Sequence, residues 1–214
     1  MRIERRFTAA DSSPYDGLAF KTASSEIRNP DGTVVASFDA VEAPEGWSQV
    51  AVDILAQKYI RKAGVPTATK PSDAAEDADC PEWLRPRIAD AEALADLPED
   101  RRMGRETSAK QVFDRLAGAW TYWGWVGGYF DGEDDARAFF DELRFMLSRQ
   151  MAAPNSPQWF NTGLHWAYGV DGPGQGHWFV DHKPGEARPS ASAYARPQPH
   201  ACFIQSIQDD LVNE

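Results

Sequence analysis

The chain has 214 residues, of which 42% are hydrophobic and 12% aromatic, and its formal net charge is −11. This composition is typical of a globular protein, and the length suffices for one sizeable core or for one domain with a small appendage. The negative charge argues against a nucleic-acid duplex or an anionic membrane as partner, whereas a nucleotide held by local donors stays compatible with it.

The two cysteines, Cys80 and Cys202, are too few for a disulfide framework or a zinc site. The first residues contain no apolar run long enough for a signal peptide. Nowhere do about 18 apolar residues follow one another, as a membrane-spanning helix requires. We therefore expect a cytoplasmic protein whose thiols are mainly reduced.

Residues 1–66 are expected to form an irregular arm, a β-hairpin and a first helix. The hairpin pairs residues 24–28 with residues 33–38, because Asn29-Pro-Asp-Gly32 supplies turn dihedrals and β-branched residues follow it. Ser48 has the side chain of an N-cap for a helix that runs to Lys62. The apolar positions of this helix follow the helical period: Ala51, Ile54, Leu55 and Tyr59.

Residues 67–105 are expected to be a flexible connector. The segment is acidic and rich in Pro, and residues 67–79 combine Pro, Thr, Ala and Asp. Cys80 follows directly, and a thiol in such a linker is interpreted as incidental rather than catalytic. A short helix is expected over residues 87–97, before Pro98.

Two strong helices are expected within residues 106–168. Ser108-Ala-Lys-Gln111 has the pattern of a capping box, and the second helix begins near Asp131 with acidic residues in its first turn and ends before Pro154. The short connection between the helices predicts antiparallel packing as an αα-hairpin. The first helix carries its apolar side chains on one face: Phe113, Leu116, Trp120 and Trp123.

Residues 169–214 are expected to form a long polar loop followed by one strand. Trp178-Phe-Val180 is the short strand expected within the loop, and a second, apolar strand is expected over residues 200–206. Alternation along that strand places Cys202, Ile204 and Ser206 on one side. No metal site is expected, because the spacing of the four histidines matches no helical ligand pair: His165, His177, His182 and His200.

Ser156 lies in a stretch that breaks the second long helix, Met151-Ala-Ala-Pro-Asn-Ser-Pro-Gln-Trp-Phe-Asn-Thr-Gly163. Two prolines flank Asn155-Ser156, so Ser156 is expected in a turn. There its hydroxyl and the nearby backbone N–H groups can meet an anion. Capping of the turn is the structural alternative.

Five sequence motifs resemble those of a known protein family. In the same order, they are similar to the N-terminal part of the adenosylcobalamin-dependent (class II) ribonucleotide reductases. The similarity runs from about Glu26 to the last residue and is weak only over residues 67–105. The motifs are Trp47-Ser-Gln, Lys58-Tyr-Ile-Arg-Lys-Ala-Gly-Val-Pro66, Gly124-Trp-Val-Gly-Gly-Tyr-Phe130, the Met151–Gly163 stretch, and Pro197-Gln-Pro-His-Ala-Cys-Phe-Ile-Gln-Ser206.

The resemblance implies a mainly α N-terminal region, made of a β-hairpin and a helical bundle, that leads into the first strand of a ten-stranded α/β barrel. The arm, hairpin and first helix (residues 1–66), the connector (67–105), and the αα-hairpin with the Ser156 loop (106–168) would precede an incomplete catalytic domain (169–214). The family continues far beyond Glu214, so the barrel is expected to be truncated here. The chain would be a fragment or one half of a split enzyme.

The resemblance also implies an activity, that of a ribonucleoside-diphosphate reductase in which adenosylcobalamin generates a thiyl radical. Cys202 corresponds to one of the reducing thiol pair, and Ser156, Ala201 and Cys202 correspond to substrate-binding positions. The implied partners are a ribonucleotide, the missing C-terminal portion in cis or in trans, and a thioredoxin-type reductant. Most of the cofactor surface would lie beyond Glu214, so the chain alone is expected to be inactive. The residues leave both a diphosphate and a triphosphate substrate open.

Two other classes of function stay open at this point. The chain could be a non-enzymatic helical module that binds or regulates a reductase partner. It could also be an independent thiol-dependent oxidoreductase that uses Cys202 alone. The latter is the weaker hypothesis, because a lone redox cysteine needs a resolving thiol and a nearby cation to lower its pKa, and the sequence places neither beside it.

Overall fold

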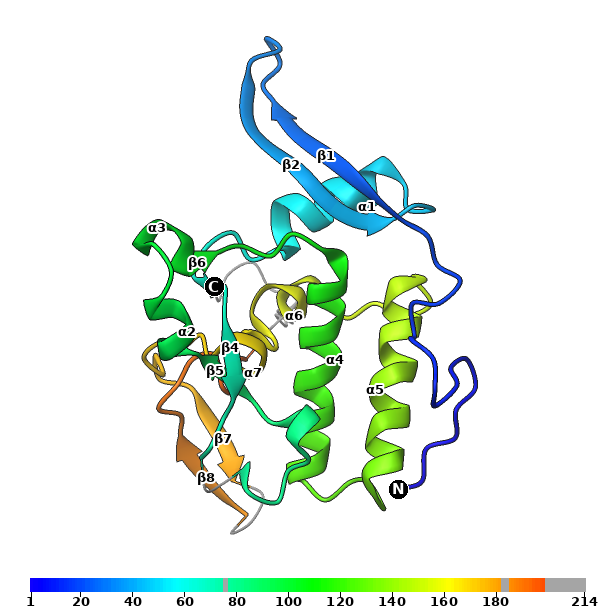
Figure 1. Ribbon diagram of the computed structural model, residues 1–214, viewed down its shortest axis with the longest axis vertical. Helices are drawn as coiled ribbons and strands as arrows, with labels where there is room; N and C mark the ends of the chain where they lie inside the picture. The colour runs from blue at the N-terminus through cyan, green and yellow to red at the C-terminus, as the bar shows by residue number, and fades with distance from the viewer. Residues whose placement is uncertain (75–76, 182–184, 199–214) are drawn as a thin grey trace, which may run out of the picture.

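The computed structural model describes residues 1–74, 77–181 and 185–198 (Figure 1). Its body is built on two long helices, α4 (Ala109–Val126) and α5 (Glu133–Ser148), with a hairpin of β1 (Phe20–Arg28) and β2 (Val34–Pro44) at one end. The described strands form two-stranded antiparallel sheets. The predicted helical region and its hairpin are thus confirmed. The structure also contains short strands that the sequence did not predict. The barrel strand predicted over residues 200–206 lies outside the described residues.

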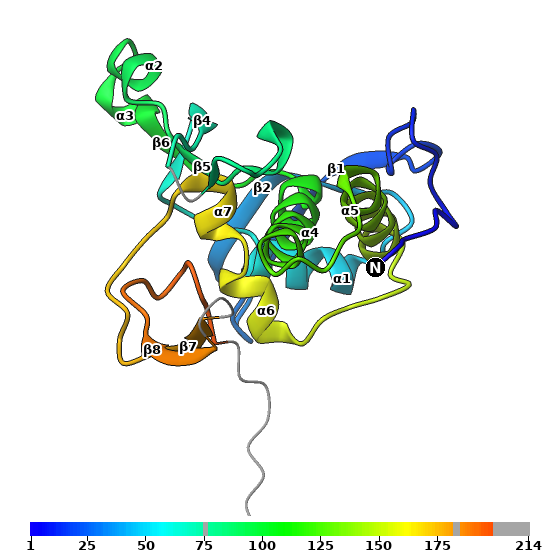
Figure 2. The ribbon, with the colours of Figure 1, turned by 90° about the horizontal axis from the view of Figure 1, so that it is seen from below.

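Helices α4 and α5 form the predicted αα-hairpin. Ser108 caps α4 in a capping box with Gln111, and three acidic residues occupy the first turn of α5. Gly124 of α4 leaves room for the ring of Phe130, which lies in the connection between the two helices, because a Cβ atom there would lie 2.8 Å from that ring. Figure 2 shows α4 between α5 on one side and α7 (Leu164–Tyr168) on the other.

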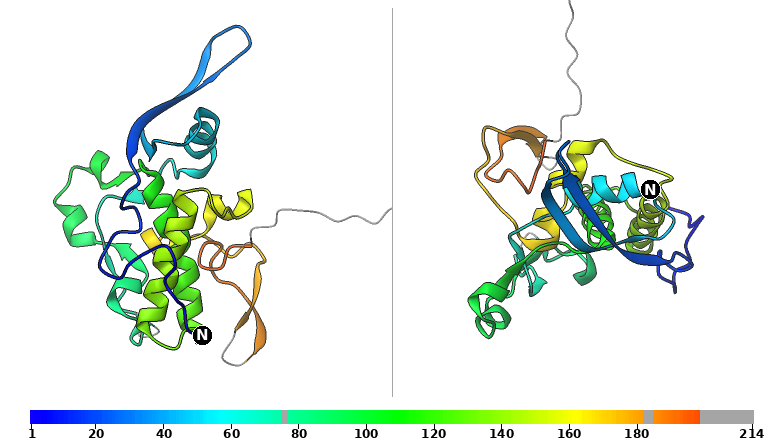
Figure 3. Two further views of the ribbon diagram at one scale, coloured as in Figure 1. Left: turned by 90° about the vertical axis from the view of Figure 1, so that its right-hand side faces the viewer. Right: turned by 90° about the horizontal axis from the view of Figure 1, so that it is seen from above.

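The hairpin extends well beyond the helical body, as Figure 3 shows from two further directions. Its strands pair from Phe20↔Pro44 to Arg28↔Val34, so the hairpin is confirmed and is longer than predicted. The register shifts between Ala23 and Ser25, where Ala40 of the facing strand has a φ of 59°. Such bulges bend a strand and increase its twist.

Helix α1 (Gln49–Ile54) begins at Ser48, whose hydroxyl accepts a hydrogen bond from the backbone N–H of Ala51 at 3.3 Å, as the sequence predicts. It then widens into a π-helical turn, η1 (Leu55–Tyr59). The predicted helix therefore ends at Tyr59 rather than Lys62. Ile54 is exposed, contrary to the predicted apolar stripe. The residues that point inward are Val52, Leu55, Ala56 and Ile60.

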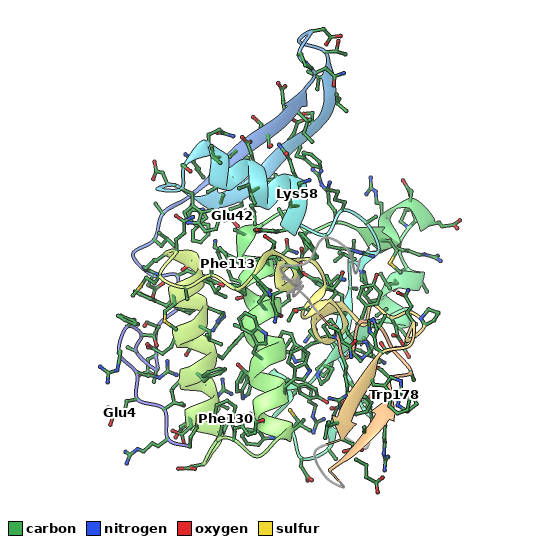
Figure 4. The ribbon with its side chains drawn as sticks, turned by 180° about the vertical axis from the view of Figure 1, so that it is seen from behind. Glu4, Glu42, Lys58, Phe113, Phe130 and Trp178 are labelled. Atoms are coloured by element: carbon green, nitrogen blue, oxygen red, sulfur yellow. The ribbon has the colours of Figure 1, made fainter. Side chains whose placement is uncertain are left out.

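The main core lies where the base of the hairpin, α1, η1, α4 and α6 (Ser156–Asn161) meet. Phe113 of α4 is fully buried at its centre and contacts the rings of Trp47 and Trp159 (Figure 4). Aromatic rings bury much area per residue, which stabilises a small core. Further buried members of this core come from β2, α4 and α5: Val41, Ala43, Ala109, Val112, Leu116 and Leu147.

Residues 67–105, predicted as a flexible connector, contain regular secondary structure. Leu84 in their middle is fully buried, and its carbonyl accepts a hydrogen bond from the indole of Trp166 at 2.9 Å. Of the helix predicted over residues 87–97, only the five residues 91–95 are helical, because residues 87–89 form a strand. The elements in and beside this segment are β3 (Val65–Pro66) paired with β6 (Met103–Gly104), β4 (Thr69–Pro71) paired with β5 (Arg87–Ala89), η3 (Glu82–Leu84), α2 (Ala91–Ala95) and α3 (Glu99–Arg102).

The last described elements follow α5. The predicted strand at residues 178–180 is confirmed as β7 (Trp178–Asp181), and it pairs with β8 (Glu186–Pro189), which was not predicted. Helix α7 was also not predicted. It lies between two glycines, Gly163 and Gly169, that both adopt the left-handed conformation. No helix within the described ranges has the length and apolar character needed to cross a bilayer.

The N-terminal arm is irregular, as expected, and carboxylates of α5 hold it: Asp135 accepts from the backbone N–H of Ile3, Asp141 pairs with Arg5, and Glu142 makes the most contacts. Glu142 accepts hydrogen bonds from the backbone N–H groups of Arg6 at 3.1 Å and Thr8 at 2.9 Å, and from the Thr8 hydroxyl at 2.8 Å. Burial opposes ionisation, but these hydrogen bonds outweigh it and lower the pKa of Glu142. The arm is thus fixed by carboxylate acceptors of α5 rather than by regular structure.

Candidate functional site

Ser156 is the first residue of the short helix α6 and its side chain is exposed. The sequence predicted a turn here. Instead, Asn155 is the N-cap, and its side chain accepts a hydrogen bond from the backbone N–H of Gln158 at 3.3 Å. Capping is therefore done by Asn155. The hydroxyl of Ser156 is left to point at a neighbour or a ligand.

The neighbour is Tyr59, the last residue of η1. Its phenol oxygen lies 3.1 Å from the Ser156 hydroxyl oxygen, within hydrogen-bond distance. The ring of Tyr59 stacks on that of Trp159 with centroids 5.0 Å apart and planes 8° apart. The indole of Trp159 in turn donates to the carbonyl of Pro154 at 3.1 Å. Stacked rings with this hydrogen bond leave the Tyr59 hydroxyl few alternative positions.

A fully buried ion pair lies beneath these rings. The Nε atom of Arg115, on α4, donates to Oε1 of Glu106 at 2.8 Å, and neither side chain is exposed. Its remaining N–H groups donate to backbone carbonyls of the two segments that hold the site. The distances are 2.9 Å to Tyr59, 2.8 Å to Trp159 and 2.6 Å to Thr162.

Glu106 extends the same network. Its Oε2 atom accepts a hydrogen bond from the backbone N–H of Arg61 at 2.7 Å, and its own backbone N–H donates to the Arg61 carbonyl at 2.9 Å. The Tyr168 hydroxyl donates to Oε1 of Glu106 at 3.0 Å. Burial, with the negative charge of Glu106, raises the pKa of Tyr168, which therefore stays protonated as a donor. One buried pair thus ties together η1, α6, α7 and the residues after η1.

Two glycines allow this close packing. A Cβ atom on Gly163 would lie 2.0 Å from the carbonyl oxygen of Arg115, and its φ of 83° is itself unfavourable for other residues. A Cβ atom on Gly118 would lie 2.1 Å from the ring of Trp166. The glycine that closes the Met151–Gly163 stretch is therefore required by its contact with α4.

Two cavities flank the exposed face of α6, and both reach Phe160 and Asn161. One, of about 320 Å³, is also lined by His177 and Tyr194. The other, of about 460 Å³, lies against η1 and the residues that follow it. A third cavity of about 300 Å³, lined by His165 and Trp166 among others, lies at α7 and α4. The first two cavities thus border the helix that Ser156 begins, although Ser156 itself lines neither of them.

Cys80, which the sequence analysis placed beside a flexible linker, is buried. Burial and the negative charge of Asp77 raise the pKa of its thiol to about 12, although Arg85 acts in the opposite direction. A thiol with such a pKa is a poor nucleophile at neutral pH. This agrees with the prediction that Cys80 has no catalytic role, for a different reason.

The other predicted site residues are not placed. Ala201, Cys202 and His200 lie outside the described residues, as does His182. Of the two remaining histidines, His165 has its Nδ1 atom 3.2 Å from the carbonyl oxygen of Val170, and Nδ1 of His177 is buried without a hydrogen-bond partner. Within the described ranges, no three side chains of the His, Cys, Asp and Glu types come together as metal ligands.

Comparison with known proteins decides the family. The sequence profile of the class II vitamin B12-dependent ribonucleotide reductases matches residues 21–150, which is more than half of the chain. This chain belongs to that family.

Similar reductases match along the whole chain. The vitamin B12-dependent ribonucleotide reductase of Bradyrhizobium diazoefficiens is 63% identical over 214 residues, and that of Agrobacterium fabrum is 60% identical over the same length. The enzyme of Rhodopirellula baltica is 28% identical over 212 residues. The chain spans 17% of the length of each of these relatives.

Sequence reasoning missed three residues of this candidate site: Tyr59, Glu106 and Arg115. Tyr59 was assigned to the apolar stripe of a helix. Arg115 follows Val112 by three residues and precedes Ala119 by four, so it lies on the buried side of α4. A cation on the apolar face of a helix needs a buried partner. That signal could have directed attention to a buried carboxylate, and Glu106 lies nine positions before Arg115 in the sequence.

Proposed function

We propose that this chain is the N-terminal part of a vitamin B12-dependent ribonucleotide reductase and that Ser156 contacts the ribonucleotide substrate. The observation that carries the proposal is the 63% identity along all 214 residues to a reductase of which the chain spans 17%. The chain alone therefore holds part of a larger enzyme's machinery. Activity requires the remainder of that enzyme, supplied in cis or in trans.

Ser156 suits the role of a phosphate contact. Its hydroxyl is exposed, and the Tyr59 hydroxyl 3.1 Å away can accept or donate as the ligand demands. A hydroxyl binds a phosphate oxygen without any cation, so an acidic chain can still hold an anionic nucleotide locally. The buried Arg115 fixes the backbone of both hydroxyl-bearing segments, which keeps the pair in position.

Cys202 supplies one of two reducing thiols in this proposal. Reduction at C2′ breaks the C2′–O bond, releases the oxygen as water and forms a C2′–H bond. The two electrons come from a pair of thiols that becomes a disulfide, and a thioredoxin-type dithiol restores the pair. Ala201 and Cys202 provide a second contact with the substrate. The second thiol belongs to the part of the enzyme that this chain does not span.

The relatives are named for vitamin B12, and the proposed enzyme is a cobalamin enzyme of the same kind. The cavities of about 300, 320 and 460 Å³ are in the lower half of the range for a drug-sized ligand, and a cobalamin is considerably larger. The described residues do not fit a cobalamin, so we assign none of them to its binding. The assembled enzyme is expected in the cytoplasm, where thiols are kept reduced.

The proposal is tested by changing Ser156 to Ala in the enzyme assembled with its remaining sequence. Loss of one hydrogen bond to a charged phosphate oxygen should raise the KM for the nucleotide about tenfold or more. The matched control is Ser12→Ala, an exposed serine of the N-terminal arm, which should leave KM unchanged. Equal KM values for both variants would remove Ser156 from the site. An assembled protein that binds a reductase partner but forms no deoxynucleotide would instead favour a non-enzymatic module.

A further inference from the structure

The side chains that line the cavity of about 460 Å³ beside η1 carry only positive charge. The side chains that line it include three cations, Lys58, Arg61 and Lys62, and no carboxylate. The whole chain has a net charge of −11, so this concentration of positive charge is a local exception. Clustered charge of one sign in a concave surface raises the local concentration of the opposite ion. Figure 4 shows Lys58 at the end of the cyan helical segment.

The three cations are not neutralised by neighbours. None of them has an ion pair with a carboxylate within the described part of the chain, and both lysines are exposed. The ammonium group of Lys62 lies 4.6 Å from the centre of the Phe38 ring. Arg61 donates from Nε to the carbonyl of Ala63 at 2.9 Å. Its guanidinium carbon lies 5.9 Å from the centre of the Tyr194 ring, an arrangement that leaves its positive charge without a carboxylate partner among the described residues.

The backbone under these cations is fixed rather than loose. The backbone N–H of Arg61 donates to Glu106, and the backbone carbonyl of Arg61 accepts from Glu106, at 2.7 and 2.9 Å. Glu106 is itself fully buried against Arg115. A site whose supporting groups are rigid loses less entropy when a ligand binds. The backbone that carries these cations is therefore held in place before a ligand binds. Lysines scattered over a surface have no such support.

The opposite wall comes from α6. Phe160 presents a ring that is 40% exposed, and Asn161 presents an exposed amide. Tyr59 lines the cavity and also lies 3.1 Å from Ser156, so the cavity continues into the site described above. Aromatic rings stack on nucleobases, and amides form hydrogen bonds with base edges. Cations, an aromatic ring and an amide together match a phosphorylated nucleoside.

We propose that this cavity binds the phosphate groups of a nucleoside di- or triphosphate, with Lys58 and Arg61 as the phosphate contacts and Phe160 as the surface on which the base stacks. The inference rests on the proposed function only in taking the anion to be a nucleotide. The same chemistry serves a substrate nucleotide that also touches Ser156, or a second nucleotide that regulates the enzyme. Either way the site consists of this chain's own residues.

The first experiment titrates the 214-residue chain with ADP and with inorganic tripolyphosphate by calorimetry at low salt. Lys58→Glu should weaken both ligands by about tenfold or more. The matched control is Lys21→Glu on β1, which changes the net charge equally at an exposed position of the hairpin and should have little effect. Equal loss in both variants, or no binding by the unmodified chain, would overturn the site.

Two further measurements complete the test. Phe160→Ala should weaken ADP but leave tripolyphosphate unchanged, because only ADP carries a base. In the assembled enzyme, Lys58→Glu should raise the KM for the substrate if the bound nucleotide is the substrate. It should instead raise the half-saturating concentration of a regulatory nucleotide if the site is regulatory. No change in either quantity would overturn the inference, whereas the proposed function would still stand if Ser156→Ala raises KM.

Discussion

The guanidinium group of Arg115 donates from Nε to Oε1 of Glu106 across 2.8 Å, and solvent reaches neither side chain. The pair joins α4 to the segment before it, and its outer hydrogen bonds reach the carbonyls of Tyr59 and Trp159. A buried charge without a partner is costly, so each of the two residues depends on the other. The position of Ser156 depends on both.

Removing one member of this pair should therefore destabilise the chain strongly. Arg115→Met leaves the Glu106 carboxylate buried and unpaired, and should lower the free energy of unfolding by about 3–5 kcal/mol. Urea denaturation followed by tryptophan fluorescence measures it. The control is Arg137→Met, which removes an exposed pair with Glu133 and should cost about 1 kcal/mol or less.

The double variant Glu106→Leu with Arg115→Met separates charge from packing. It leaves no buried charge, so its loss of stability should be smaller than the sum of the two single losses. Additive losses would show that the pair acts only through the volume it fills. That outcome would contradict an electrostatic role for the pair.

Gly163 should not tolerate any side chain. Gly163→Ala combines a positive φ with a Cβ atom 2.0 Å from the Arg115 carbonyl oxygen, and should cost about 3 kcal/mol or more. Gly128→Ala is the control, because Gly128 also has a positive φ, of 69°, but open space around it. It should cost about 1 kcal/mol. Similar losses for both variants would mean that the backbone near Gly163 can move away from α4.

Tyr59→Phe tests the hydroxyl pair. The change keeps the ring that stacks on Trp159 and removes the partner of the Ser156 hydroxyl, so the stability of the chain should fall by about 1 kcal/mol or less. In the assembled enzyme the KM for the nucleotide should rise several-fold, with kcat changed less. Tyr129→Phe, at an exposed tyrosine, is the control and should leave KM unchanged. An unchanged KM in Tyr59→Phe would mean that Ser156 acts without Tyr59.

Cys80 should be unreactive until the chain unfolds. Its pKa is raised from 9.0 to about 12 in the folded chain, so below pH 9 both states keep the proton and the stabilising contribution is complete. As the pH rises from 9 towards 12, the unfolded state loses its proton first and this contribution is lost. In a Cys202→Ser background, a thiol reagent at pH 8 should label Cys80 only in urea. Rapid labelling of the native chain would contradict its burial.

Local signals in the sequence predicted several elements correctly. Ser108 and Gln111 form the capping box, Ser48 caps α1, and Asn29-Pro-Asp-Gly32 connects the strands of the hairpin. These are interactions between residues close in the sequence, so their pattern is visible there. The same holds for the two long amphipathic helices.

Long-range contacts account for what the sequence did not predict. The segment 67–105 is ordered by its contacts with distant residues, such as the Trp166 indole on the Leu84 carbonyl. The first helix continues into the π turn η1, and no residue propensity marks that turn. Arg115 reaches Tyr59 and Trp159, which lie 56 and 44 positions away in the sequence. The Ser156 stretch was identified by family resemblance, but the residues that hold it could not be.

The most direct test of the account is deoxynucleotide formation by three preparations with adenosylcobalamin, a dithiol reductant and a ribonucleotide. The 214-residue chain alone should form none. The chain assembled with its remaining sequence should form deoxynucleotide, and the same assembly carrying Cys202→Ser should bind nucleotide but form none, because an alcohol cannot enter the disulfide that carries the two electrons. Product from the chain alone, or full turnover by the Cys202→Ser assembly, would contradict the account.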